Sequence, residues 1–423
     1  MPEPINSFEP PRGMRDFYPE EMALREHIFQ AWRTSARQSG FAAYDACVVE
    51  SLALLKRKAG EEIVEQIYTF TDKSGRELAL RPEMTPTLAR MVLARQGSLT
   101  FPLKWTTIAQ CFRYERTTRG RKREHYQWNL DIIGENSMGA EIEVIACAVN
   151  ALALLGLHAS DVYIHFSSRA LLSDLLVKFG IAPPHHTATF LALDKRGKIP
   201  DEEIAKLLEA EGLDEAARAT VFNLLRVSTF EEAGAILGAD TPSYEAVKTF
   251  LNLADAYGIR DILKFDISVI RGLAYYTGIV FEAFDAARQF RAIFGGGRYD
   301  RLLQDLGGKP ASCVGLGFGD VVIAELLAAQ NKTGAIQAAA DMAIGFMDEA
   351  QRMAAIRLAV RLRKSGKTVD VALAPEKPKH FFGRAGKGGF KDAAYLGPDD
   401  VARNKVRIKN LAAFTEQEMD LPQ

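Results

Sequence analysis

Cysteine is scarce in this chain of 423 residues, and the cysteines that occur do not cluster. No CxxC motif and no Cys/His spacing typical of metal ligands connects Cys47, Cys111, Cys147 and Cys313. This spacing argues against a structural zinc site and against a disulfide scaffold. We therefore expect free thiols in a reducing compartment, the cytoplasm, and no metal ion held by the protein's own side chains.

Long hydrophobic runs are also missing from the sequence. The best candidate, Val144–Leu157, has roughly 14 residues and is interrupted by Asn150, whereas about 20 apolar residues are needed to span a bilayer. The N-terminal residues lack the basic stretch and apolar run of a signal peptide. The sequence predicts a buried core helix at this position and no membrane role.

The sequence also has no large excess of charge of either sign. The 53 Lys and Arg residues nearly balance the 54 Asp and Glu residues, which leaves a net charge of −1. This balance excludes a uniformly basic nucleic-acid coat, although a local basic face stays compatible with it. The hydrophobic share of 48% and the charged share of 25% are typical of folded globular domains.

Residues 19–39 are predicted to form a long helix, because Pro19 suits the first helical position and Gly40 can end the helix. A Leu- and Ala-rich segment at about 171–257 predicts a helical insertion into a part rich in strands. Strands are predicted in pairs at 68–71 with 77–80, 105–116 with 125–134, and 263–270 with 279–284, and singly at 314–318.

Two domains are predicted from this pattern. Residues 1–330 combine the predicted strands with the insertion, which indicates an α+β fold, and the Ala-rich residues 331–340 indicate a linker. Residues 341–423 alternate strands and helices, as in a small α/β domain. Residues 361–391 contain nine Lys or Arg residues but only two acidic residues. This excess of basic residues indicates either a solvated face or a surface that contacts a phosphate backbone.

Polar residues cluster at the ends of the predicted strands. Glu83 and Thr85 follow the strand at 77–80, where a carboxylate and a hydroxyl can converge on an ammonium group or begin a helix. Period-two spacing places Arg113 and Glu115 on one face of their predicted strand. By the same spacing, one face of the next predicted strand carries Gln127, Asn129 and Asp131.

The connection between these two strands is rich in arginine and lysine, and it contains Arg121. Planar guanidinium groups suit phosphate oxygens better than point charges do. Further on, Arg271 precedes a glycine and the tyrosines Tyr275 and Tyr276. This order suits either a close approach to a small polar ligand or a buried tyrosine pair in a core strand.

Glycines gather in two later segments, 295–297 and 315–319, and Tyr299 follows the first of them. Glycine allows a close backbone approach or a positive φ. Neither segment has the GxxxxGK[ST] pattern of a phosphate-binding loop, so ordinary turns are the simpler interpretation. A nucleotide site would therefore depend on arginine side chains from strands.

In order and spacing, these motifs resemble class II aminoacyl-tRNA synthetases, and histidyl-tRNA synthetases in particular, over nearly the whole chain. The resemblance implies an antiparallel catalytic sheet flanked by helices, a C-terminal anticodon-binding-like domain and a homodimer. The segments that carry it are 11–16, 68–70, 112–134, 271–276, 297–300, 314–319 and 354–409.

The resemblance also implies a reaction: ATP and L-histidine form histidyl-adenylate, and the histidyl group then passes to tRNA-His. Mg²⁺ would accompany ATP. Arg113 and Arg271 would hold the α-phosphate and the histidine carboxylate. Glu115 would face the adenine, with His125 in place of the usual stacking aromatic residue, and Arg121 would face the distal phosphates.

For the amino acid, the resemblance assigns the α-amino group to Glu83, Thr85 and Gln127. It assigns the two imidazole nitrogens to Asp131 and Tyr276, and places Tyr275, Tyr299 and Arg271 in the same site. Neutral imidazole both donates and accepts, so its pocket needs an acceptor and a donor. tRNA contacts would come from the basic face of the C-terminal domain, through Lys377, Lys379 and Arg384.

The chain departs from the family pattern at the third class motif, where Val322 stands in the place of an arginine that lies against ATP. Asp131 is one methylene shorter than the glutamate of many members. Two further hypotheses follow from such departures. One is a histidine-sensing regulatory subunit of ATP phosphoribosyltransferase, which usually lacks the C-terminal domain that this chain retains. The other is a ligase that transfers histidine to a different acceptor.

Overall fold

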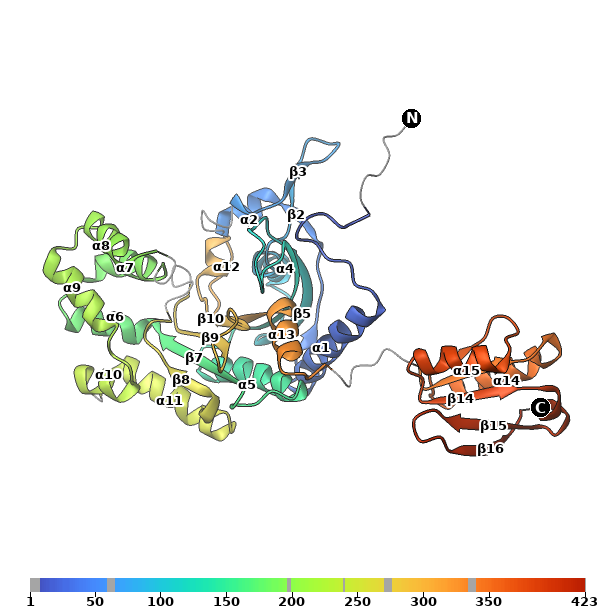
Figure 1. The fold of residues 1–423 in the computed structure, drawn as a ribbon. Helices are drawn as coiled ribbons and strands as arrows, with labels where there is room; N and C mark the ends of the chain where they lie inside the picture. Colours follow the sequence, from blue (N-terminus) through green and yellow to red (C-terminus); the bar gives the residue numbers. More distant parts are fainter. Residues whose placement is uncertain are drawn as a thin grey trace. The chain divides into compact units, whose positions relative to one another are not determined.

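The structure, a computed structural model, describes residues 8–58, 65–195, 199–238, 240–269, 276–333 and 340–422. The chain forms two compact units, drawn as a ribbon in Figure 1. The first unit consists of Met1–Phe17 with Leu24–Thr333, and the second of Tyr18–Ala23 with Gly334–Gln423. Each unit has its own sheet and its own buried core.

An eight-stranded sheet, antiparallel except at its two edges, is the centre of the first unit. In spatial order its strands are β1 (Ala42–Ala43), β5 (Leu103–Phe112), β6 (Glu124–Ile133), β11 (Cys313–Gly319), β10 (Phe294–Arg298), β9 (Ile279–Asp285), β7 (Val162–Ser168) and β8 (Leu263–Phe265). The glycine-rich segments lie in β10 and β11, so the strand predicted at 314–318 is present and the interpretation of the glycines as ordinary turns is wrong.

One face of this sheet is buried under helices α1 (Pro19–Gln38), α5 (Gly139–Leu154) and α13 (Asp320–Ala329). Trp32 of α1 stacks on Trp128 of β6 with ring centroids 5.7 Å apart. The helices predicted at 19–39 and 144–157 are thus both present, and the second is the apolar core helix that the sequence indicated. Among the described residues, no helix has the length and apolarity needed to cross a membrane.

The opposite face of the sheet carries α4 (Thr85–Arg95) and the short α12 (Leu302–Asp305), whose apolar residues pack on Leu103, Ile133 and Cys313. A small antiparallel sheet and a helix precede α4. Their elements are β2 (Val49–Ser51), α2 (Leu52–Lys58), β3 (Thr69–Thr71) and β4 (Glu77–Leu80). β3 and β4 form the predicted hairpin, and Gly75 adopts φ +79° in its turn.

Helices fill the segment between β7 and β8, where the composition predicted a helical insertion (Figure 1). They are α6 (Arg169–Lys178), the 3₁₀ turn η1 (Pro183–His185), α7 (His186–Leu193), α8 (Asp201–Ala210), α9 (Glu215–Leu224), α10 (Phe230–Leu237), α11 (Pro242–Ala256) and the 3₁₀ turn η2 (Arg260–Ile262).

The predicted pairing of the segments 263–270 and 279–284 is wrong. β8 ends at Phe265 and pairs with β7, and β7 separates it from β9. The chain leaves the sheet because Val269 donates its N–H to the Asp266 carbonyl, and Ser268 donates its N–H to the Asp266 carboxylate at 2.9 Å. This local turn competes with continued strand pairing.

The second unit is an α/β domain with a five-stranded sheet. Asp348 caps its longest helix by accepting the N–H of Ala350 at 3.0 Å. The elements are β12 (Met342–Phe346), α14 (Glu349–Lys364), β13 (Val369–Val371), α15 (Pro378–Lys387), β14 (Asp392–Leu396), α16 (Pro398–Ala402), β15 (Lys405–Asn410) and β16 (Glu416–Asp420).

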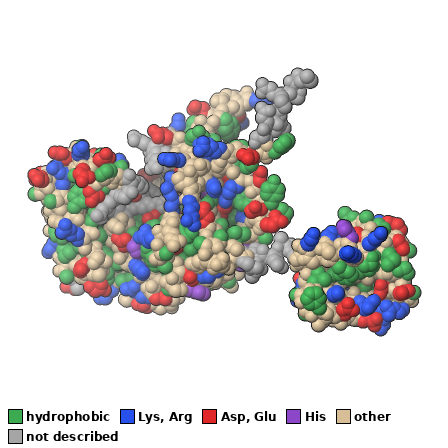
Figure 2. All heavy atoms as spheres, viewed as in Figure 1, with side chains coloured by type: hydrophobic (Ala, Val, Ile, Leu, Met, Phe, Trp, Pro, Cys, Tyr) green, Lys and Arg blue, Asp and Glu red, His purple; other side chains and the backbone are tan. Residues whose placement is uncertain are grey.

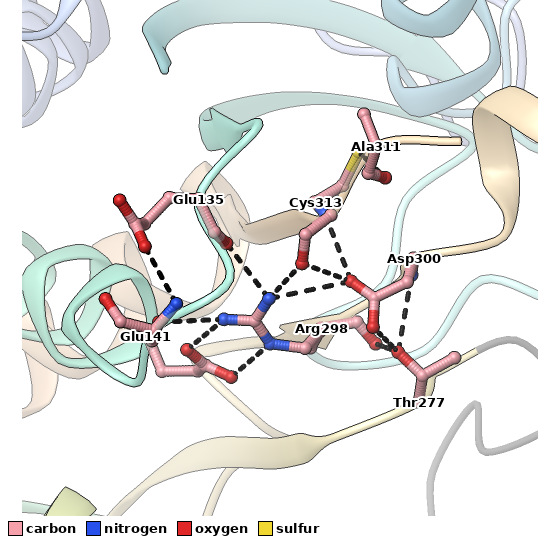
Figure 3. A network of polar contacts seen from close by, with 9 residues as sticks. Glu135, Glu141, Thr277, Arg298, Asp300, Ala311 and Cys313 are labelled. Carbon is pink, nitrogen blue, oxygen red and sulfur yellow. Dashed lines mark hydrogen bonds and ion pairs between the residues drawn. The ribbon is translucent and has the colours of Figure 1, made fainter. Parts of the chain in front are cut away.

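A buried arginine connects the middle of the large sheet to α5 (Figure 3). Arg298, at the end of β10, forms a bidentate ion pair with Glu141, in which Nε and Nη2 each lie 2.6 Å from a carboxylate oxygen. Arg298 also donates to the backbone carbonyls of Glu135, at 3.1 Å, and Ser137, at 3.0 Å. The pair is almost completely buried.

Asp300 continues this network toward two other segments (Figure 3). Its carboxylate accepts the Thr277 hydroxyl at 2.7 Å and the Cys313 N–H at 3.3 Å. Thr277 in turn donates its N–H to the Arg298 carbonyl at 2.7 Å. The network therefore fixes the ends of β10 and β11 and the residues before β9 against the first turn of α5.

We expect Glu141→Leu to destabilise the first unit by about 3–5 kcal/mol, because it leaves the Arg298 charge buried without its partner. Urea unfolding of the full chain measures the change. Glu26→Leu is the control, since the Glu26–Arg33 pair is exposed and its loss should cost less than about 1 kcal/mol. Equal losses in the two variants would contradict the role assigned to the buried pair.

Candidate functional site

Strand β6 separates a core face from a polar face. Trp128, Leu130 and Ile132 point into the core beneath α1 and α5. The alternate residues share the opposite face, as the period of two predicts: His125, Gln127, Asn129 and Asp131. The sequence thus predicted which side chains of this strand lie together.

Glycines in the two neighbouring strands leave room above this polar face. Gly315 of β11 pairs with Asp131 on one side and with Gly297 of β10 on the other. A Cβ atom at Gly315 would collide with the Asp131 carboxylate, and one at Gly317 would lie 2.6 Å from Gln127 Nε2. These positions therefore require glycine so that the β6 side chains can lie across β11.

Three of the predicted site residues converge at this place. The Tyr299 hydroxyl donates to Asp131 Oδ1, and both side chains are buried. The ring of Tyr276 lies over Gly297, where a Cβ atom would approach its Cδ1 to 2.9 Å. The structure thus brings the carboxylate and the two phenols predicted for one pocket to the same part of the sheet, from β6, from the residue after β10 and from the segment before β9.

The N-terminal end of α4 lies over the same face. Met84 packs on Ala109 of β5, a residue whose register partner is Gln127. Next to Met84, Thr85 is buried, while the half-buried Glu83 carboxylate has no hydrogen-bond partner in the described part of the chain. The acid and the hydroxyl predicted to bind an ammonium group therefore stand beside the amide predicted to join them.

Arg113 and Glu115 do not lie on a strand face, so that part of the prediction is wrong. β5 ends at Phe112, one residue before the Arg113 N–H makes the last bond in register, to the Arg123 carbonyl at 2.9 Å. The next N–H groups bond elsewhere, that of Tyr114 to the Gln66 carbonyl at 2.7 Å. The Arg113 guanidinium instead donates to the Pro82 carbonyl at 2.9 Å. Arg113 consequently reaches the segment that carries Glu83, at the end of the polar face.

The loop between β5 and β6 pairs two other predicted residues with each other. Arg121 Nε lies 2.5 Å from a carboxylate oxygen of Glu115. The loop tip rests on α13, where the Gly120 N–H donates to Glu325 at 2.9 Å, and a Cβ atom at Gly120 would lie 3.4 Å from Val322. Val322, which replaces the expected arginine, is thus buried beneath this loop.

His125 stays neutral at physiological pH. Burial, together with the charges of Arg113 and Arg15, lowers its pKa from the ordinary 6.5 to about 3. The neighbouring Cys111 also stays uncharged, since burial raises the pKa of its thiol to about 12. An uncharged aromatic ring thus stands where the resemblance places adenine.

Sequence reasoning missed two residues that shape this region. Arg81 is buried and donates to the carbonyls of Gln110, at 2.9 Å, and Ala46, at 3.0 Å, so that it joins three chain segments. The Tyr44 ring lies 5.5 Å from the ring of Trp105 on β5. Neither residue belongs to a local pattern, and only the pairing of β1 with β5 brings Tyr44 near the site.

Arg271 and Tyr275 lie outside the described residues, so their predicted roles stay predictions. Within the described ranges, no group of three or more His, Cys, Asp or Glu side chains could hold a metal ion. Figure 2 shows Lys and Arg side chains gathered over the middle of the first unit, near α4 and β5.

The predicted tRNA-binding residues lie at α15 of the second unit, where Figure 2 also shows basic side chains. Lys377 and Lys379 are exposed. Arg384 forms ion pairs with Glu376 at 2.7 Å and Asp370 at 3.1 Å. Its charge is therefore largely offset within the domain, unlike those of the two lysines.

The lowered pKa of His125 predicts a pH dependence of stability. The unfolded chain takes up this proton below about pH 6.5, but the folded chain only near pH 3. The free energy of unfolding therefore falls as the pH drops from 6.5 toward 3, by up to about 1.4 kcal/mol per pH unit. Above pH 6.5 the imidazole of His125 is neutral in both states and contributes no pH dependence.

His125→Phe should remove this contribution. Its melting temperature should fall less than that of the wild type between about pH 7 and about pH 4.5. His158→Phe, which removes an exposed imidazole, is the control. The same pH dependence in His125→Phe and the wild type would show that this imidazole is not responsible.

Known proteins resemble this chain over most of its length. A family model described as histidyl-tRNA synthetase matches residues 13–319. The chloroplastic/mitochondrial histidine–tRNA ligase of Arabidopsis thaliana is 41% identical over 412 residues, which cover 97% of this chain and 85% of that protein. The histidine–tRNA ligase of Opitutus terrae is 40% identical over 419 residues, which cover 98% and 96%.

Solved structures have the same fold. A histidyl-tRNA synthetase from Nostoc superposes with a TM-score of 0.82 at 20% identity, over 98% of this chain and 97% of that one. A Bacillus halodurans protein described as an ATP phosphoribosyltransferase regulatory subunit/histidyl-tRNA synthetase gives 0.75 at 22% identity, over 93% and 99%. The predicted α+β fold of the class II synthetases is confirmed.

The two relatives match nearly the whole chain, and the matched family model spans Asp131, Tyr299 and the glycines of β10 and β11. The resemblance that the motifs indicated is therefore confirmed, and the chain belongs to the histidyl-tRNA synthetase family.

Proposed function

We propose that this chain is a histidine–tRNA ligase, which activates L-histidine with ATP and transfers it to tRNA-His. The observation that carries the proposal is the convergence of Asp131, Tyr299, Tyr276 and Gln127 over the glycines of β10 and β11. This arrangement leaves space for a small ligand beside polar groups whose positions are fixed by a sheet.

In the first step, a carboxylate oxygen of histidine attacks the α-phosphorus of ATP. The bond to the β-phosphate oxygen breaks, and pyrophosphate leaves. Arg113, placed at the end of the polar face, and Arg271 offset the negative charge that builds on the α-phosphate in this step. ATP binds as its complex with Mg²⁺, so the metal ion arrives with the substrate.

The amino acid lies above β6 and β11. Glu83, Thr85 and Gln127 hold its α-ammonium group, and Asp131 accepts the imidazole N–H with Tyr299 fixing the carboxylate from the other side. Tyr276, across Gly297, faces the other ring nitrogen. A wrong side chain in this pocket leaves buried polar groups unpaired, which can give discrimination of about 10⁴–10⁵.

At the mouth of the site, the Arg121–Glu115 pair opens when ATP binds. Arg121 then turns to the distal phosphates, while Glu115 and the neutral ring of His125 face the adenine.

In the second step, a hydroxyl of the tRNA's 3′-terminal ribose attacks the acyl carbon, and AMP leaves. The first unit is the catalytic domain, the second unit binds the anticodon region, and the protein acts as a homodimer in the cytoplasm.

Pyrophosphate exchange with each amino acid tests the proposed reaction. We expect exchange with histidine alone, and a fall in rate of about 10²–10³ in Arg113→Ala, because one charged donor to the reacting phosphate is lost. Arg116→Ala, an exposed arginine of the same segment, is the control and should keep the wild-type rate. Binding of histidine without any exchange would favour a histidine-sensing regulator instead.

The exposed lysines of the second unit generate a separate prediction. Lys377→Ala/Lys379→Ala should weaken tRNA-His binding and reduce the slope of log affinity against log salt by about 1.5, while adenylate formation is unchanged. Lys405→Ala is the control, since Glu418 already pairs with Lys405 at 2.9 Å. Filter binding at several salt concentrations measures both, and an unaltered slope in the double variant would exclude these lysines from the tRNA contact.

A further inference from the structure

Two buried polar atoms beside the amino-acid pocket have no hydrogen-bond partner. Within the described residues, the Tyr44 hydroxyl oxygen and Asn129 Oδ1 are both closed off from solvent and unpaired. A buried polar group without a partner costs free energy, so native structures seldom leave one unless a ligand or a water completes it. Two such atoms near one site therefore need an explanation.

Both atoms belong to side chains on the polar face of the large sheet. Asn129 lies between Gln127 and Asp131 on β6, and its register partner on β5 is Thr107. Tyr44 follows β1 and donates its N–H to the Thr106 carbonyl at 2.9 Å, which continues the parallel pairing and places it beside Thr107. Tyr44 and Asn129 thus flank one residue in a single row across three strands.

The surroundings of Tyr44 keep its hydroxyl protonated. Burial raises the pKa of Tyr44 well above its ordinary value, the charge of Asp131 raises it further, and the charge of Arg81 opposes these effects. The ring packs on Trp105 and on the apolar group of Met84, Ala109 and Cys111. The hydroxyl is therefore a donor in a dry, apolar setting near the carboxylate of Asp131.

Asn129 offers the complementary group. Its carbonyl oxygen accepts, and neither atom of its amide has a hydrogen bond in the described structure. The backbone of Asn129 is already fixed, because its carbonyl accepts the Thr106 hydroxyl at 2.9 Å. A small group that accepts from Tyr44 and donates to Asn129 would satisfy both side chains.

We propose that Tyr44 and Asn129 are specificity-determining residues of the amino-acid pocket, and that they pair with such a group when histidine is bound. This group is a water enclosed beside the bound ring, because the two ring nitrogens already pair with Asp131 and Tyr276. The inference rests on the proposed function, since it takes histidine as the ligand. An apolar side chain in the pocket would leave both atoms unpaired and would be rejected.

Calorimetric titration with L-histidine tests the inference without depending on catalysis. We expect Tyr44→Phe and Asn129→Leu each to raise the Kd for histidine about three- to tenfold, which is the range of one hydrogen bond. Tyr126→Phe, the same change on the core side of β6, is the control and should leave the Kd unchanged. The double variant should bind no worse than about twofold beyond either single variant, because both lose the same bound group.

Stability and structure supply the other readouts. The melting temperature of free Tyr44→Phe should equal or exceed that of the wild type, because no bond is lost. A crystal structure of the histidine complex should show a water between the two side chains, and a complex with no group at hydrogen-bond distance from either atom would overturn the inference.

An unchanged Kd in Tyr44→Phe would overturn the inference, and so would a clear loss of stability in the free variant. A wild-type protein that binds histidine but does not catalyse exchange would refute the proposed reaction and leave this result standing. Failure of histidine to bind the wild type would refute both.

Discussion

The candidate site depends on the pairing of one polar strand with two strands that carry glycine at alternate positions. Side chains of β6 can lie across β11 only because Gly315 and Gly317 have no Cβ atom, and the same constraint at Gly297 admits the ring of Tyr276. Four polar side chains of β6 thereby lie on one face of the sheet, next to the backbone of β11. Strand register, which is a backbone property, thus determines which functional groups meet.

A buried ion pair fixes the strand ends that form the candidate site. The Arg298–Glu141 pair joins the end of β10 to the start of α5, and Tyr299, the next residue, presents its hydroxyl to Asp131. Because an unpaired charge in this position is costly, few alternative arrangements of the β10 end are accessible. The orientation of the Asp131 carboxylate is therefore set by a network that does not itself touch the ligand space.

Much of this arrangement could be predicted from the sequence, and the failures have physical causes. Period-two spacing identified the polar face of β6, since strand geometry repeats at every second residue. The same reasoning failed for Arg113 and Glu115, because the Tyr114 N–H bonds to the Gln66 carbonyl and the Glu115 N–H to the Arg113 carbonyl, which ends the pairing with β6. The glycines were interpreted as turns, although a strand was predicted at 314–318, because composition alone cannot distinguish a turn from a strand that must accommodate a neighbour's side chain. Tyr44 could not be found, because its role depends on pairing between strands about 60 residues apart.

Electrostatics separate the interior of the site from its mouth. Burial keeps His125, Cys111 and Tyr44 uncharged around the polar face, by lowering the pKa of the imidazole and raising those of the thiol and the phenol. The arginines lie at the ends of the strands: Arg113 directly follows β5, and the Arg121–Glu115 pair lies in the loop between β5 and β6. A ligand with a neutral, hydrogen-bonding group at one end and an anionic group at the other matches this division. Histidine has this form when its carboxylate reacts with the α-phosphate of ATP, because the imidazole is neutral and the phosphate is anionic.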